Sequence, residues 1–216
     1  MSIRAWLHRR ASERRNRRER PSLKAFREAA ARLGPGDVAL DCGANVGAFT
    51  VLMAESGARV YAFEPNPAAF EELVARTSVF PNVTALQGAV TAAPGPVKLF
   101  LHKWTDHDPV YWSTGSSVLA GKNNVRSDSF VTVATFQLPV FFAEFGISRV
   151  HLLKMDIEGA EVEVLNQLLD LGLHTVIDRA FVEVHDRRVA ELAEPTRLLR
   201  QRLRSLGAEQ FCLDWR

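Results

Sequence analysis

The stretch that decides the fold reads DCGANVG, residues 41–47, and it lies between an apolar run, Val38–Leu40, and a helical pattern that ends at Ala54. An apolar run followed by a glycine-containing turn and a helix is the pattern of a strand that leads into a crossover helix. In an open α/β sheet, ligands bind at the carboxyl ends of such strands. The stretch therefore predicts an α/β fold and a binding site at its first turn.

Strand and helix patterns alternate along the rest of the chain, with one interruption. The predicted strands are 38–40, 59–63, 83–87, 150–155, 175–184 and 210–214, and the predicted helices are 23–33, 45–54, 66–77, 160–171 and 191–206. Between residues 89 and 149, short β segments at 97–101 and 130–136 flank a long stretch, 102–129. Because parallel strands need crossover helices of this kind, we predict a doubly wound, mostly parallel α/β sheet with an insertion, 89–149, before the fourth core strand.

The composition is that of an ordinary globular protein. Of the 216 residues, 47% are hydrophobic and 24% are charged, which argues against disorder and against a collagen-like or disulfide-rich chain. No apolar run reaches the roughly 18 residues of a spanning helix, and the N-terminus lacks the apolar core of a secretory signal, so a cytoplasmic location is expected. Cys42 and Cys212 belong to no Cys/His cluster, and we expect both to be reduced, buried thiols.

Residues 1–20 form a basic arm next to a mildly acidic domain. The arm contains eight arginines and two glutamates, a charge of +6, whereas the whole chain carries +2. Ile3, Trp6 and Leu7 have the spacing of one apolar stripe on a short helix, which is typical of segments at a membrane surface. A solvated tail, weak peripheral contact with an anionic membrane and contact with nucleic acid all fit this pattern. Residues 21–216 are predicted to form a single domain.

The glycine turn is not a dinucleotide fingerprint. That fingerprint reads G-x-G-x-x-G, whereas Gly43 and Gly47 are four residues apart and Asn45 lies between them. Glycines here allow the backbone to approach a ligand closely, and Asp41 is placed to accept a hydrogen bond from an ammonium group, directly or through water. Glu64 ends the second predicted strand, 21 residues after Gly43, where an acidic side chain can accept both hydroxyls of a ribose. This combination suits S-adenosylmethionine.

The fourth predicted strand runs into an acidic turn, KMDIEGAE, residues 154–161. Asp156 at the strand tip is expected to point toward the same crevice as the glycine turn. Glu161 and Glu163 suit the first turn of the following helix, where negative charge interacts favourably with the helix dipole. Asp156 is therefore the candidate site residue of this segment, for cofactor binding and for catalysis.

The next strand ends in EVHD, residues 183–186. His185 is the candidate general base, because the reference pKa of histidine, about 6.5, lies near the working pH. Glu183 or Asp156 would orient or assist it. As an alternative, Asp156, Glu158, Glu183 and His185 could together hold a divalent cation that acidifies a hydroxyl. The main prediction contains no metal.

Together these motifs resemble the FkbM-type S-adenosylmethionine-dependent methyltransferase family. The resemblance spans residues 37–186 and rests on DCGANVG, on FEP at 63–65 and most specifically on KMDIEGAE, which matches the family's [KR]-x-D-[IV]-E-G-x-E segment. Ser116, Ser117 and the Glu183–His185 pair are also similar to family positions. The resemblance implies a Rossmann-like class I methyltransferase that binds S-adenosylmethionine through Asp41, Gly43, Asn45, Gly47, Glu64 and Asp156. The chain departs from the usual sheet in having one strand after the last helix, not two.

We therefore expect an O-methyltransferase that acts on a hydroxyl of a small molecule or glycan, with the catalytic residues His185, Asp156 and Glu183. Aromatic side chains of the insertion, Trp104, His107, Tyr111 and Trp112, could stack on a sugar ring or pack in the core. The alternatives are an RNA ribose methyltransferase and a non-catalytic nucleotide-binding Rossmann-like domain. A nicotinamide oxidoreductase is disfavoured because the third glycine is absent.

Overall fold

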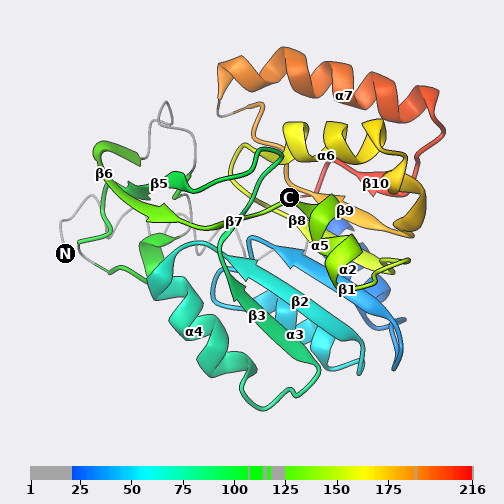
Figure 1. Ribbon diagram of the computed structural model, residues 1–216, viewed down its shortest axis with the longest axis horizontal. Helices are drawn as coiled ribbons and strands as arrows, with labels where there is room; N and C mark the ends of the chain where they lie inside the picture. The colour runs from blue at the N-terminus through cyan, green and yellow to red at the C-terminus, as the bar shows by residue number, and fades with distance from the viewer. Residues whose placement is uncertain (1–20, 107, 114–115, 118–124, 188, 216) are drawn as a thin grey trace.

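The computed structural model describes residues 21–106, 108–113, 116–117, 125–187 and 189–215. Six parallel strands form the central sheet, in the order β10-β9-β8-β1-β2-β3 (Figure 1). They are β1 (Val38–Cys42), β2 (Arg59–Glu64), β3 (Val83–Gln87), β8 (Leu152–Met155), β9 (Ala180–Val182) and β10 (Phe211–Cys212). The chain runs outward from β1 to β3 and then outward in the other direction from β8 to β10. Its direction reverses between β1 and β8, which is where ligands bind in such sheets.

Helices cover both faces of this sheet, as the predicted doubly wound fold requires (Figure 1). The helices are α2 (Pro21–Ala30), α3 (Ala48–Ala54), α4 (Pro67–Thr77), α5 (Leu138–Glu144), α6 (Glu161–Asp170) and α7 (Ala193–Ser205). Neighbouring residues of a strand point to opposite faces. Leu40 of β1 accordingly belongs to the core cluster formed with α5, α6 and α7, whereas Ala39 belongs to the cluster formed with α2 and α3.

The insertion before the fourth core strand is present and carries its own small sheets. β5 (Val97–His102) pairs in antiparallel fashion with β6 (Val125–Val133), and β4 (Ala89–Val90) pairs in parallel with β7 (Thr135–Phe136). A short 3-10 helix, η1 (Tyr111–Ser113), lies between β5 and β6. Helix α5 was not predicted, because its seven residues begin with Leu138-Pro139 directly after a β segment.

The C-terminal part differs from the expectation in one place. Residues 175–184 are predicted as one strand, but the chain forms a 3-10 helix, η2 (Leu173–Val176), and the strand β9 covers only Ala180–Val182. The apolar β-branched run Thr175–Ile177 has the composition of a strand, yet it only continues the turn after α6 and makes a single bridge, between Ile177 and Val150. One strand, β10, follows α7, as predicted.

Three further predictions concern the basic arm, the two cysteines and membrane-spanning segments. The basic arm, residues 1–20, is not among the described residues. Cys42 is buried as expected, whereas Cys212 is partly exposed. Among the described helices, none has both the length and the apolar character needed to cross a membrane.

Candidate active site

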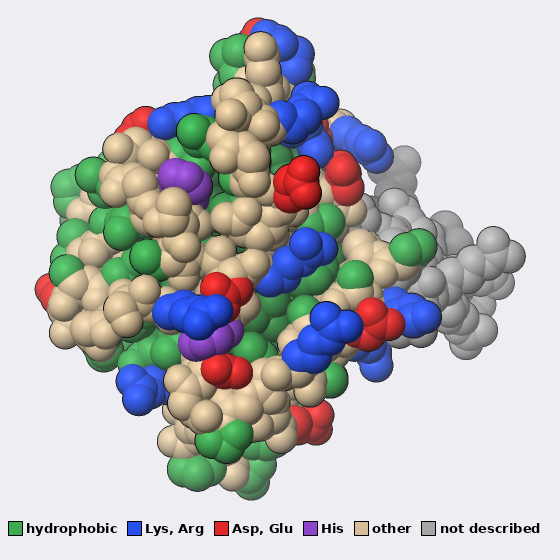
Figure 2. All heavy atoms as spheres, turned by 90° about the vertical axis from the view of Figure 1, so that its right-hand side faces the viewer, with side chains coloured by type: hydrophobic (Ala, Val, Ile, Leu, Met, Phe, Trp, Pro, Cys, Tyr) green, Lys and Arg blue, Asp and Glu red, His purple; other side chains and the backbone are tan. Residues whose placement is uncertain are grey.

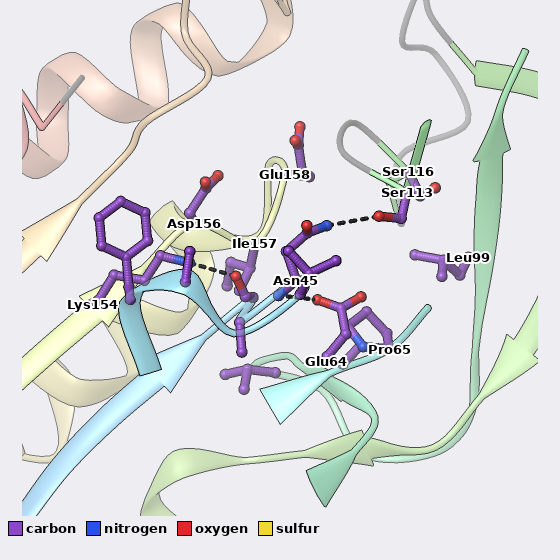
Figure 3. Close-up of a pocket in the computed structure, with 17 residues that line it drawn as sticks. Asn45, Glu64, Pro65, Leu99, Ser113, Ser116, Lys154, Asp156, Ile157 and Glu158 are labelled. Carbon is purple, nitrogen blue, oxygen red and sulfur yellow. Dashed lines mark hydrogen bonds between the residues drawn. The ribbon is translucent and has the colours of Figure 1, made fainter. Parts of the chain in front are cut away.

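A pocket lies at the carboxyl ends of β1, β2 and β8, at the reversal of the strand order (Figure 3). Its walls come from four parts of the chain: the loop after β1, the end of β2, the insertion and the turn after β8. Of the predicted site residues, the pocket is lined by Gly43, Asn45, Glu64 and Asp156. Asp41, Gly47, Glu183 and His185 do not line it.

Glu64 is held at the end of β2 by two backbone donors. The Glu64 Oε2 atom accepts a hydrogen bond from the backbone N–H of Asn45 at 2.7 Å, and Oε1 accepts one from the backbone N–H of Asn66 at 2.8 Å. Burial raises the pKa of Glu64 to about 7, although both backbone hydrogen bonds act to lower it. Each oxygen keeps a lone pair for a further donor. The carboxyl group therefore fits the predicted contact with ribose hydroxyls.

The sequence explains the local conformation at Asn45 and Asn66, the two residues whose backbone N–H groups hold Glu64. Asn66 caps α4, because its side chain accepts hydrogen bonds from Ala68 and Ala69 while Pro67 occupies the first helical position. Asn45 adopts a left-handed conformation with φ 50°, which asparagine tolerates better than most residues. Its side chain donates to Ser113 Oγ of the insertion at 2.8 Å (Figure 3).

Both glycines of the first turn are required by the packing of the chain itself. Gly43 has φ 78°, and a Cβ atom there would lie 1.9 Å from the carbonyl oxygen of Asp156. Gly47 has φ 80°, and its Cβ atom would lie 2.8 Å from the Leu73 side chain. Gly43 lines the pocket and can still offer backbone to a ligand. Gly47 is the N-cap of α3 and does not line the pocket, so its expected ligand contact stays a prediction.

Asp41 lies beneath the loop and not in the pocket. Its side chain is fully buried, its Oδ2 atom accepts a hydrogen bond from Thr50 Oγ1 at 2.7 Å, and its Oδ1 atom lies 3.2 Å from Lys154 Nζ. Lys154 also donates to the carbonyl oxygen of Gly43. Because Lys154 neutralises this carboxylate beneath the loop, the expected contact of Asp41 with an ammonium group of the ligand, directly or through water, stays a prediction.

Lys154 was missed as a site residue. It lies in the buried strand β8, is 2% exposed and lines the pocket. A lysine inside an apolar strand must find an acidic partner, because an unpaired buried charge is very unfavourable. That rule could have paired Lys154 with Asp41, since the two belong to adjacent strands in direct register.

The turn after β8 carries two carboxylates into the pocket, Asp156 and Glu158 (Figure 3). Glu158 has φ 60°, an uncommon conformation for a residue with a Cβ atom, and such residues gather at functional sites. The buried Glu161 holds the turn in shape, since its carboxylate accepts hydrogen bonds from the backbone N–H groups of Ile157 and Gly159. Glu161 therefore stabilises the turn through hydrogen bonds, in addition to its expected interaction with the helix dipole.

His185 lies behind these carboxylates. Its ring is 2% exposed, with Nε2 at 3.1 Å from Glu158 Oε2 and 3.7 Å from Asp156 Oδ1, and Nδ1 at 3.1 Å from Glu161 Oε1. Burial lowers the pKa of His185, but the contacts with Glu158 and Glu161 outweigh it and raise the pKa to about 10. At neutral pH the ring is therefore already protonated.

These surroundings place His185, the predicted general base, behind the pocket, and its catalytic role stays a prediction. A protonated imidazole cannot accept a further proton, and the ring does not line the pocket. Glu183 is also buried and does not line the pocket, so its expected assistance in catalysis is not a contact with substrate. Of the three predicted catalytic residues, Asp156 alone reaches the pocket.

Three serines connect the insertion to the core loops. Ser113 accepts from Asn45, Ser116 Oγ accepts from the side chain of Asn66 at 3.4 Å, and Ser117 Oγ donates to the carbonyl oxygen of Glu158 at 2.7 Å. Their roles depend on long-range contacts that the sequence pattern does not reveal.

The structure describes the packing of two of the aromatic side chains predicted as candidates for sugar stacking, Trp104 and Trp112. Trp112 is buried and stacks on His102, with ring centroids 4.7 Å apart and an angle of 11° between the planes. Trp104 packs against the edge of the same pair. This arrangement favours packing over sugar stacking for Trp112. His107 and the side chain of Tyr111 lie outside the described residues.

The comparison with protein families identifies the chain. Residues 41–209 match the family described as the methyltransferase FkbM domain. The chain belongs to this family. This membership confirms the family that the motifs predicted. The matched region contains the loop after β1, Glu64, the insertion and the acidic turn.

Three relatives are each 25–28% identical to this chain. NoeI of Sinorhizobium fredii, a 2-O-methyltransferase, is 28% identical over 158 residues, which are 69% of this chain and 65% of NoeI. AglP of Haloferax volcanii, a hexuronic acid methyltransferase, is 25% identical over 150 residues, 69% of this chain and 56% of AglP. FkbM of Streptomyces tacrolimicus, a 31-O-demethyl-FK506 methyltransferase, is 28% identical over 203 residues, 82% of this chain and 76% of FkbM.

The matched regions of NoeI and AglP are thus less than two thirds of those proteins. Among solved structures, the precorrin-6y C5,15-methyltransferase of Geobacter metallireducens is similar at a TM-score of 0.42 with 13% identity, covering 86% of this chain and 72% of that one.

Proposed function

We propose that this methyltransferase transfers the methyl group of S-adenosylmethionine to a hydroxyl oxygen of a small molecule or glycan. The observation that carries the proposal is the pair of carboxylates, Asp156 and Glu158, in the same pocket as Glu64. Carboxylates can orient a hydroxyl group and accept its proton. The names of NoeI, AglP and FkbM, which specify 2-O, hexuronic acid and 31-O methylation, support an oxygen acceptor.

The end of β2 suits the cofactor. Glu64 would accept hydrogen bonds from the ribose hydroxyls, and the backbone of Gly43 and Asn45 would line the same side. Bound S-adenosylmethionine supplies a methyl group on a positively charged sulfur atom. The buried pair of Asp41 and Lys154 keeps the loop after β1 in place beneath it.

The turn after β8 suits the acceptor. With cofactor and acceptor bound, Asp156 or Glu158 would accept the hydroxyl proton while the methyl group moves from sulfur to the acceptor oxygen. His185 acts as a positioning residue, since its ring contacts both carboxylates from behind. Glu161 holds the turn through backbone hydrogen bonds, so that both carboxylates face the pocket.

The test is an assay with S-adenosylmethionine and a panel of acceptors that contains hexuronic acids, neutral sugars and hydroxylated macrolides. S-adenosylhomocysteine formation reports turnover, and NMR of the product locates the new methyl group. The proposal expects a methyl group on oxygen and a large loss of turnover in Asp156→Asn and Glu158→Gln. A matched control is Glu163→Gln, because Glu163 is exposed on the next helix. A product methylated on nitrogen or carbon would contradict the proposal.

RNA ribose as the acceptor is not favoured by the described surface. Figure 2 shows acidic and basic side chains interspersed on one face of the domain, and the ion pairs of the described residues include Arg149–Asp178 and Arg202–Asp170. Binding to a nucleic acid backbone calls for a patch of clustered positive charge. For the arm, residues 1–20, weak association with anionic membranes or nucleic acid stays a proposal.

A further inference from the structure

The side chains around His185 have the spacing of metal ligands. One ligand atom each from Asp156, Glu161 and His185 can be chosen so that all three lie within 4.8 Å of one another. Ligands of Mg²⁺ lie about 2.1 Å from the ion, so two of them are at most about 4.2 Å apart. Small side-chain movements would therefore bring these three atoms around one ion.

His185 provides an independent observation. The ring is 98% buried, and although carboxylate oxygens lie 3.1 Å from both nitrogens, neither nitrogen has a partner with hydrogen-bond alignment. Buried polar atoms in proteins are nearly always paired, so such a nitrogen calls for an explanation. An ion between the ring and the carboxylates would satisfy the nitrogen and the oxygens together.

The charges of the cluster also favour a cation. Three carboxylates, those of Asp156, Glu158 and Glu161, contact one imidazole ring. Lys154 comes from the same strand, β8, but its ammonium group is paired with Asp41. Three carboxylates around one imidazole thus provide oxygen and nitrogen donors of the kind that a divalent cation takes.

We propose that Asp156, Glu161 and His185 bind a divalent cation of the Mg²⁺/Mn²⁺ class beside the acceptor end of the pocket. Carboxylate oxygens and one imidazole suit Mn²⁺, and Mg²⁺ accepts carboxylates together with water. Three protein ligands leave coordination positions open. Asp156 lines the pocket (Figure 3), so the ion would lie next to the acceptor side. Binding of the ion would displace the proton of the ring.

The effect of the ion rests on the proposed function, whereas its binding does not. A hydroxyl group bound to the cation becomes more acidic, because the positive charge stabilises the alkoxide. Glu158, which lies next to the ligand set, would then accept the proton. The methyl group would go to the alkoxide oxygen, and the carbon–sulfur bond would break as in the proposed reaction.

The test is a titration of the full chain with Mn²⁺, followed by calorimetry and by the loss of the free Mn²⁺ signal in electron paramagnetic resonance. No acceptor or cofactor is needed. We expect one site that Mg²⁺ competes for, and at least about tenfold weaker binding in Asp156→Asn and His185→Gln, the scale on which metal sites respond to a disturbed ligand environment. Glu163→Gln, which removes an exposed carboxylate of the same helix, should bind like the wild type.

Circular dichroism and thermal unfolding serve as controls for folding. Mn²⁺ should raise the unfolding temperature of the wild type and of Glu163→Gln, and it should not raise that of His185→Gln. No binding to the wild type at millimolar Mn²⁺, or equal binding in all variants, would overturn the metal site. Metal binding as expected combined with methylation of nitrogen or carbon would overturn only the proposed function.

Discussion

At the end of β2, Glu64 is a single buried carboxyl group held by two backbone N–H groups, whereas at the end of β8 three carboxylates surround one imidazole ring. Backbone donors partly compensate charge without adding a full positive charge, so Glu64 remains suited to neutral hydroxyl groups. The cluster at β8 is compensated by side-chain charge and is suited to cations and protons. The two ends of the pocket thus differ chemically, and we propose that the first binds the cofactor and the second the acceptor.

The largest expected effect is the loss of turnover when the carboxylates at the acceptor end are removed. Asp156→Asn and Glu158→Gln remove the pocket carboxylates that orient the hydroxyl and accept its proton, and general-base groups typically contribute about a hundredfold to ten-thousandfold to turnover. We expect a loss of kcat on this scale in at least one of the two variants, measured as S-adenosylhomocysteine formation. If both variants kept near-normal turnover on the true acceptor, the acidic turn would have no catalytic role.

The second largest effect should be a loss of folding stability when the buried ion pair of Asp41 and Lys154 is broken. Lys154→Met leaves the Asp41 carboxylate buried without its cation, and breaking a buried ion pair from one side costs about 3–5 kcal/mol of folding free energy. Urea unfolding followed by circular dichroism measures this loss. The double variant Asp41→Leu/Lys154→Met should recover most of it. A single variant as stable as the wild type would mean that the pair does not hold the two strand ends together.

A smaller effect is that the affinity for S-adenosylhomocysteine should depend on pH through Glu64. Burial raises the pKa of Glu64 to about 7, and the ionised form is the better acceptor for ribose hydroxyls. Affinity for S-adenosylhomocysteine should therefore fall as the pH drops below 7, by up to about tenfold per pH unit for one titrating group. Glu64→Gln should lose this dependence. Calorimetry between pH 5.5 and 8 would show a flat wild-type profile if Glu64 did not contact the cofactor.

The same pKa shift has a consequence for stability. The folded-state pKa of Glu64 lies above its ordinary value of 4.5, so the folded protein binds the proton more tightly than the unfolded chain does. Its contribution to stability is therefore complete below pH 4.5 and is lost as the pH rises through 7. Comparing urea unfolding of the wild type and of Glu64→Gln across this range isolates the contribution of Glu64.

The smallest effect should come from the arm. Deletion of residues 2–20 should leave cofactor affinity unchanged, because both ends of the pocket lie within the described domain. Any role of the arm should appear as salt-sensitive sedimentation with anionic vesicles or RNA, since exposed charges are screened by salt. Identical sedimentation of the full-length and shortened proteins would indicate a solvated tail.

The two ends of the pocket also differ in how far the sequence predicts them. The place of Glu64 follows from its spacing after Gly43, because one crossover helix of ordinary length brings adjacent parallel strand ends together. The role of His185 does not follow from spacing. Glu158, which adopts a positive φ in the turn after β8, and Glu161 contact its ring, and these contacts raise the pKa of the ring.

The insertion shows a similar limit. Its position between β3 and β8 can be predicted, because the alternation of strand and helix stops there. The hydrogen bonds from Asn45 to Ser113 and from Ser117 to Glu158 join residues that are 68 and 41 positions apart. Local propensity carries no information about such pairs. The family resemblance pointed to Ser116 and Ser117 but gave no reason for them.

The most direct test of two different ends is a calorimetric titration of S-adenosylhomocysteine into Glu64→Ala and Glu158→Gln side by side. Glu64→Ala should weaken binding by about 1.5 to 3 kcal/mol, the scale of hydrogen bonds to a charged group, which is roughly tenfold to more than a hundredfold. Glu158→Gln should bind within about twofold of the wild type, because Glu158 contributes at the acceptor end. Unchanged affinity in a correctly folded Glu64→Ala, or equal losses in both variants, would contradict the division of the pocket.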